Sequence, residues 1–156
     1  TIEEFDDSLR VYRTGDLEPL NIKTMPHPGF PTDMQPLMTV LLTLAKGTSI
    51  ITEGIWENRF RYVDELTRMG ANIQVDGRVA VIEGVQELLP APMRAADLRA
   101  GAALVVAALA ADGVSEVDEI CHIERGYEDI VEKLRGLGAD IKRVEKPAGV
   151  LRQAAL

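Results

Sequence analysis

The feature of this sequence that most constrains its fold is a pattern that occurs twice. The segment Leu-Thr-Arg-Met-Gly-Ala-Asn-Ile at residues 66–73 matches Leu-Arg-Gly-Leu-Gly-Ala-Asp-Ile at residues 134–141. Three further pairs of residues recur at a similar spacing: Asp33 with Asp97, Gly47 with Gly113, and Arg59 with Arg125. A period of about 64 to 68 residues is too long for a common solenoid repeat and fits a βαβαββ unit.

The hydrophobic pattern therefore predicts an α/β chain with two βαβαββ units, repeat one at about 8–85 and repeat two at about 92–144. In repeat one we expect strands at 8–13, 20–24, 48–53, 71–75 and 79–83, and helices at 33–46 and 60–69. In repeat two we expect strands at 93–96, 114–120 and 139–144, helices at 97–112 and 127–137, and a loop at 122–126. Residues 145–156 are expected to form a loose tail.

The helix expected at 97–112 consists of Ala, Val, Leu and Gly on nearly every side. Such a helix is typically buried all round. We therefore expect it at the centre of the molecule.

A rigid turn precedes the first helix, because the closely spaced Pro26, Pro28 and Pro31 each fix φ. Thr32 or Asp33 is then expected to cap that helix. Each unit places an Asp at the start of its first helix and an Arg at the start of its second, and helix N-termini favour anions. Two interpretations stay open: the Asp residues are caps with the Arg residues fixing loops, or both pairs converge on one site.

Composition excludes several functional classes. A net charge of −8 over 156 residues argues against a general nucleic-acid binder. No apolar run is long enough to span a membrane, and the acidic N-terminus does not resemble a signal peptide. Cys121 is the one cysteine, which suits a reducing cytoplasm, and neither it nor His27 or His122 has metal-ligand spacing. We expect no metal and no cofactor.

Five ordered motifs resemble the signature of the UDP-N-acetylglucosamine 1-carboxyvinyltransferase (UDP-GlcNAc enolpyruvyl transferase) family. They are Pro-Gly-Phe-Pro-Thr-Asp-Met-Gln (28–35), Glu-Asn-Arg-Phe (57–60), Arg-Met-Gly-Ala (68–71), Ala-Asp-Leu-Arg-Ala (96–100) and Arg-Gly-Tyr-Glu (125–128). Together they cover roughly residues 8–144, and their order and spacing make the resemblance far more specific than any one motif.

The resemblance implies a fold and an activity. Family members transfer the enolpyruvyl group of phosphoenolpyruvate to the 3-hydroxyl of UDP-N-acetylglucosamine and release phosphate, the first committed step of peptidoglycan synthesis in the bacterial cytoplasm. Their fold is an inside-out α/β barrel, with two domains of three βαβαββ units each. Transferase activity, cell wall biogenesis, cell shape and cell division are the functions that this resemblance implies.

The resemblance also implies roles for individual residues. Asp33 matches the proposed general base, and Arg125 matches the arginine that grips phosphoenolpyruvate. Asp97 matches an acidic residue that supports domain closure and is implicated in proton transfer. Arg59 and Arg99 match arginines that line the cleft, and Ile55 matches a position where the backbone approaches the sugar nucleotide.

Two departures from the family are visible. Glu124 stands where many members have Asp. Full-length members are also more than twice as long, so the chain is expected to correspond to a C-terminal portion with two units of one domain. The family's Lys-Asn pair, its acid-bearing loop and its second phosphoenolpyruvate-binding arginine match nothing here, and Cys121 is not the loop cysteine. We therefore expect the chain alone to be inactive and to need the remainder of the same enzyme.

Two alternatives remain. One is a related 5-enolpyruvylshikimate-3-phosphate synthase, although the motifs at 28–35 and 57–60 favour the sugar-nucleotide enzyme. The other is a non-catalytic, truncated binding module. A domain that lacks one unit should expose apolar surface, so we also expect self-association.

Overall fold

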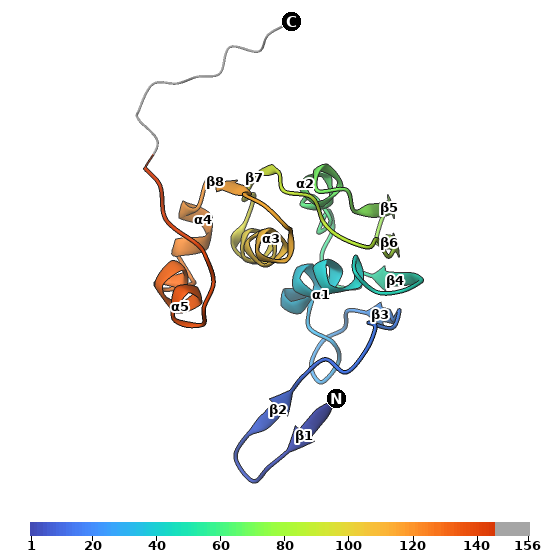
Figure 1. Cartoon of the computed structure of the whole chain (residues 1–156). Coiled ribbons are helices and arrows are strands. Elements are labelled where there is room, and N and C mark those ends of the chain that lie inside the picture. Colours follow the sequence, from blue (N-terminus) through green and yellow to red (C-terminus); the bar gives the residue numbers. More distant parts are fainter. Residues whose placement is uncertain (146–156) are drawn as a thin grey trace, which may run out of the picture.

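The computed structural model describes residues 1–145, and its elements follow one another in two groups with a hairpin at the N-terminus (Figure 1). Apart from Glu145, the tail expected at 145–156 lies outside the described residues. Within this described part, no helix is long and apolar enough to cross a membrane.

The N-terminal hairpin consists of β1 (Ile2–Glu4) and β2 (Leu9–Val11), which pair antiparallel with Ile2 opposite Val11. The strand expected at 8–13 is therefore present in shortened form, and its partner β1 was not predicted. The hairpin projects away from the other elements (Figure 1), and the Ile2 and Val11 side chains are exposed.

A four-stranded sheet forms one side of the first group. Its strands β3 (Asn21–Lys23), β4 (Thr48–Thr52), β5 (Asn72–Asp76) and β6 (Val79–Glu83) lie in the order β3-β4-β6-β5. β3 and β4 are parallel, and the other pairs are antiparallel. The hairpin predicted at Asp76-Gly77 is confirmed, because Gly77 takes a φ of +55° between β5 and β6.

The first-group helices are a 3₁₀ turn η1 (Thr32–Met34), α1 (Gln35–Leu42) and α2 (Val63–Arg68). The prediction that Thr32 or Asp33 caps the first helix is wrong. Pro31 and Met34 occupy the cap positions without side-chain hydrogen bonds. The Thr32 hydroxyl instead donates to Glu53, and the Asp33 carboxylate accepts from arginines.

The second group begins with β7 (Pro92–Arg94) and β8 (Glu116–Asp118), parallel strands joined through α3 (Leu98–Ala110). The prediction of a loop at 122–126 is wrong, because α4 (Cys121–Glu124) occupies most of this segment. α5 (Ile130–Gly136) starts later than predicted, since Asp129 before it has a φ of +48°.

The strand expected at 139–144 is also wrong. These residues form no regular element, and Val144 is 64% exposed. A strand needs a neighbour for its backbone hydrogen bonds, and this segment is paired with none of the strands in the described residues.

α1 and α3 pack side by side at the centre of the molecule (Figure 1). The small residues Ala100, Ala103 and Ala107 of α3 are buried in the main core, together with residues of α1 and the sheet. The expectation that this helix is buried all round is wrong, because Val106 and Leu109 are 43% and 40% exposed. Among residues 1–145, no element covers this side of α3.

α3 and α4 approach each other closely at Gly101. A Cβ atom at this position would lie 2.6 Å from Ile123 Cγ1 and 2.9 Å from Ala95 Cβ. Contacts this short require neighbouring atoms to move, so glycine is needed here for packing rather than for its backbone conformation.

We therefore predict that Gly101→Ala lowers the free energy of unfolding by about 1 to 3 kcal/mol, because it overpacks this contact. Gly136→Ala in α5 is the matched control, since a Cβ atom there meets nothing within 4 Å. Urea unfolding followed by circular dichroism would measure both variants. Equal stability of the two would contradict the prediction.

Candidate active site

The carboxylate of Asp33 lies between two arginines that come from different groups of elements. Its Oδ1 accepts from Arg59 Nη2 at 3.5 Å, and its Oδ2 accepts from Arg99 Nη2 at 3.0 Å. Arg59 precedes α2, whereas Arg99 lies in the first turn of α3. Asp33 is 54% exposed as a side chain, so solvent or a ligand can reach it.

Arg99 has a second partner, because its Nη1 donates to the Tyr127 hydroxyl at 3.2 Å. This hydrogen bond is the largest of the effects that raise the pKa of Arg99, and the charge of Asp33 adds to it. An arginine guanidinium stays protonated in proteins, so Arg99 places a positive charge beside Asp33.

Asp97 and Arg125 are arranged differently from their counterparts Asp33 and Arg59. Asp97 caps α3, with its Oδ1 accepting from Ala100 N at 2.8 Å, so the cap interpretation is correct for this residue. Arg125 is exposed at the end of α4, where its backbone N–H donates to Ile123 O, and its side chain forms no hydrogen bond or ion pair with any residue of the described part. The two predicted Asp–Arg pairs are thus not equivalent.

Glu53 is a central residue of this region that the sequence analysis missed. It is 1% exposed, and its carboxylate accepts four hydrogen bonds. The donors are Thr24 Oγ1 at 2.7 Å, Thr32 Oγ1 at 3.0 Å, Ile55 N at 2.9 Å and Trp56 N at 3.1 Å. Glu53 therefore ties together the end of β3, the turn that carries Asp33, and the loop that leads to Arg59.

Burial by itself would raise the pKa of Glu53, but hydrogen bonds from hydroxyl and backbone donors outweigh it and hold that pKa below its usual value of 4.5. The alternation along β4 could have indicated this residue. Ser49 and Ile51 point inward, and Glu53 has the same phase.

A second buried polar cluster lies beneath α1. The Tyr62 hydroxyl lies within hydrogen-bond distance of Gln35 Oε1 at 3.1 Å and of Thr39 Oγ1 at 2.8 Å. Burial raises the pKa of Tyr62, so it stays protonated. Gln35 Nε2 and Arg59 Nε are buried donors without a partner among the described residues.

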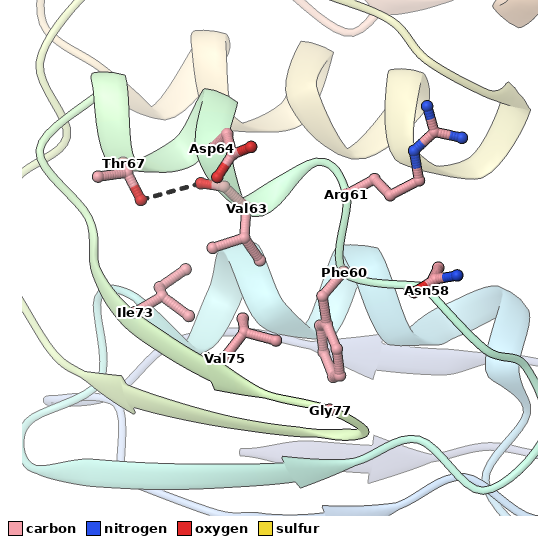
Figure 2. Close-up of a pocket in the computed structure, with 9 residues that line it drawn as sticks. All are labelled: Asn58, Phe60, Arg61, Val63, Asp64, Thr67, Ile73, Val75 and Gly77. Carbon is pink, nitrogen blue, oxygen red and sulfur yellow. Dashed lines mark hydrogen bonds between the residues drawn. The ribbon is translucent and has the colours of Figure 1, made fainter.

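A hollow of about 640 Å³ lies elsewhere, between α2 and the β5–β6 hairpin (Figure 2). Figure 2 shows an apolar floor of Phe60, Val63, Ile73 and Val75 beneath α2. None of the predicted site residues lines it. In the described part of the chain, no three or more His, Cys, Asp or Glu side chains gather as they would for a metal ion.

The sequence of residues 1–134 matches the family described as EPSP synthase (3-phosphoshikimate 1-carboxyvinyltransferase). The chain is 57% identical over 145 residues to UDP-N-acetylglucosamine 1-carboxyvinyltransferase 3 of Caldanaerobacter subterraneus, covering 93% of this chain and 35% of that relative. It is 56% identical over 142 residues to the UDP-N-acetylglucosamine 1-carboxyvinyltransferase of Desulfofundulus thermocisternus, covering 91% of this chain and 58% of the relative.

Among solved structures, the enolpyruvyl transferase NikO from Streptomyces tendae superimposes with a TM-score of 0.83 at 34% identity, covering 91% of this chain and 33% of NikO. EPSP synthase from Acinetobacter baumannii superimposes with a TM-score of 0.52 at 24% identity, covering 71% of this chain and 28% of that enzyme, which shows the fold alone. These findings confirm the predicted enolpyruvyl transferase fold. The chain spans about a third of the length of most of these relatives.

We predict that Glu53→Gln destabilises the chain at neutral pH, by about 1 to 3 kcal/mol, because it removes a charged acceptor from four donors. Since the pKa of Glu53 is lowered in the folded state, its stabilising effect is present above pH 4.5 and is lost as pH falls below that value. The difference from wild type should therefore shrink on acidification.

Urea unfolding from about pH 7 down to about pH 3.5 would measure this difference. Glu57→Gln is the matched control, because the Glu57 side chain is 80% exposed and pairs with Arg78 at the surface. A difference in the free energy of unfolding between Glu53→Gln and wild type that stays constant with pH would contradict the prediction.

Proposed function

The chain belongs to the EPSP synthase family, and from this we propose that it supplies part of the active site of a carboxyvinyltransferase. The proposed reaction moves the enolpyruvyl group of phosphoenolpyruvate to the 3-hydroxyl of UDP-N-acetylglucosamine and releases phosphate. The observation that carries this proposal is Asp33, an exposed carboxylate held by Arg59 and Arg99.

The choice of acceptor rests on the relatives. Several that are 54–58% identical bear the name UDP-N-acetylglucosamine 1-carboxyvinyltransferase. The solved EPSP synthase is only 24% identical to this chain and supports the fold alone. A shikimate substrate therefore has weaker support than UDP-N-acetylglucosamine. Because the chain spans about a third of most of these relatives, we propose that the remainder of the same enzyme completes the cleft.

In the proposed mechanism, Asp33 takes the proton of the sugar 3-hydroxyl while that oxygen adds to C2 of phosphoenolpyruvate and C3 gains a proton from an acid in the remainder of the enzyme. The resulting tetrahedral intermediate then loses phosphate from C2 and one proton from C3, which restores the double bond. Arginine side chains suit this chemistry, since they stabilise negative charge on the phosphate and carboxylate of the intermediate. Arg125 is exposed and has no partner in the described part, so it is free to bind such an anion.

Asp97 and Ile55 have more limited roles in this proposal. The Asp97 carboxylate is held at the start of α3 by Ala100 N, two residues before Arg99, from where it supports closure and proton transfer. The N–H of Ile55 donates to Glu53. The Ile55 carbonyl is therefore the backbone group that we expect to approach the sugar nucleotide.

The biological setting follows from this reaction. We propose a cytoplasmic enzyme of peptidoglycan precursor synthesis, which serves cell wall biogenesis and hence cell shape and division. No metal, nucleic acid or membrane enters the proposed step.

We predict that this chain, grafted in place of the matching segment of the Caldanaerobacter relative, gives an enzyme that releases phosphate from the two substrates. Asp33→Asn in that graft should lower kcat by about 10²- to 10⁴-fold, because the proposed general base is lost. Asp16→Asn is the matched control, since Asp16 is a surface carboxylate paired with Lys46 at 2.6 Å.

The isolated chain should release no phosphate. Turnover by the isolated chain would show that its site is self-contained, and an Asp33→Asn graft with unchanged kcat would contradict the role of the base.

We also propose that the isolated chain self-associates through the exposed apolar side chains of its central helices, namely Leu41, Val106 and Leu109. Sedimentation velocity should detect dimers or larger species of wild type. Leu109→Lys should shift the distribution toward monomer, whereas Val114→Lys, at an 88% exposed position outside these helices, should not. A single monomer peak for wild type would contradict this.

A further inference from the structure

We propose that Tyr127 is a positioning residue that holds Arg99 against Asp33 and thereby couples the segment carrying Arg125 to the proposed base. This inference rests on the proposed function for the role of Asp33, but its structural half can be tested separately. It assigns a role to a residue that makes no direct contact with Asp33.

The Arg99 guanidinium is held on two sides. Its Nη2 donates to Asp33 Oδ2 at 3.0 Å, and its Nη1 donates to the Tyr127 hydroxyl at 3.2 Å. The planar fork of an arginine fixes the angle between its two Nη groups. Anchoring one of them to Tyr127 therefore restricts where the other can meet the Asp33 carboxylate.

The Tyr127 ring adds a second contact, because the Arg99 guanidinium carbon lies 5.8 Å from the ring centroid. Tyr127 is half-buried and packs against the cluster formed by Ala95, Val105 and Ile123. The protein thus holds the ring in place, and both its face and its hydroxyl meet the end of Arg99.

The segment that carries Tyr127 is pressed against the start of α3. A Cβ atom at Gly126 would lie 2.8 and 2.9 Å from the two Cδ atoms of Leu98, the residue just before Arg99. Tyr127 N also donates to Ile123 O in α4 at 3.0 Å. Backbone and side-chain contacts therefore link residues 125–127 to Leu98 and Arg99.

Arg125 lies two residues before Tyr127 and is exposed, without a partner among the described residues. An anion that binds Arg125 would pull on the same short segment that anchors Arg99. Binding at Arg125 would then alter how firmly Arg99 orients Asp33, so that the base is placed correctly when the anionic substrate is present.

The first test uses the chain as it exists. ¹⁵N NMR of the arginine side chains should give separate Nη signals for Arg99, because rotation about its Nε–Cζ bond is restricted by two partners. In Tyr127→Phe, which keeps the ring but loses the hydroxyl, these signals should average. Unchanged Arg99 signals in Tyr127→Phe would overturn the proposal.

Tyr12→Phe is the matched control. The Tyr12 hydroxyl is also hydrogen-bonded, although here it donates, to Glu3 Oε1 at 2.9 Å, and the ring also lies under an arginine, with the Arg10 guanidinium carbon 5.1 Å from its centroid. It follows β2 of the N-terminal hairpin, and the partners of its side chain are Glu3 and Arg10 rather than Arg99. The Arg99 signals should therefore not change in this variant.

The second test uses the grafted enzyme. Tyr127→Phe should lower kcat by about three- to tenfold, as expected for the loss of one hydrogen bond, and should leave the KM for the sugar nucleotide within about twofold. Tyr12→Phe should leave both unchanged. A kcat for Tyr127→Phe equal to that of the unsubstituted graft would overturn the coupling.

A double-mutant cycle with Arg99→Lys separates positioning from general damage. If Tyr127 acts through Arg99, Tyr127→Phe should change kcat by less than about twofold once Arg99 is lysine. If Tyr127→Phe instead lowers kcat of the Arg99→Lys graft by the same factor as in the unsubstituted graft, Tyr127 does not act through Arg99. A graft without any turnover would instead overturn the proposed function, and the NMR result would still decide whether Tyr127 holds Arg99.

Discussion

The close parallel packing of α1 and α3 is the constraint on which the site depends. Asp33 lies just before α1, and Arg99 lies in the first turn of α3, so the two can meet only if both helices start at the same end of the molecule. The small side chains of Ala100, Ala103 and Ala107 keep α3 narrow where the core elements pack together. A bulkier α3 would move Arg99 away from Asp33.

Glu53 provides the fixed support beneath this meeting point. A buried charge is costly unless its lone pairs are satisfied, and here four donors from three segments satisfy them. The arrangement keeps the carboxylate ionised and holds Thr32, the neighbour of Asp33, in a defined position. The solvent-exposed part of the site is thus built on a buried and fully hydrogen-bonded one, which is how precise placement of a reacting group is usually achieved.

Much of the framework could be predicted from the sequence, because strands and turns such as Asp76-Gly77 have strong local signals. The repeat predicted roles for Asp33 and Arg59, whereas Arg99 was predicted only from the family resemblance. Tertiary contacts decided the rest. The sequence alone could not show that Thr32 donates to Glu53, or that Asp33 accepts from arginines instead of capping the helix. Both outcomes depend on which side chains the fold brings next to these two residues. Local periodicity also does not report which neighbouring elements are present. For this reason the sequence did not predict that Val106 on α3 is exposed, or that residues 139–144 form no strand.

The two layers of the site should respond differently to ionic strength. The Glu53 carboxylate is 1% exposed and is held by neutral hydroxyl and backbone donors, so dissolved ions have little access to it. Asp33 and Arg99, in contrast, face solvent, and mobile ions weaken attraction between exposed charges. Added salt would therefore loosen the grip of the arginines on the carboxylate while the turn beneath it stays in place. Ionic strength would therefore change the contacts of Asp33 without changing the Glu53 hydrogen bonds that support it.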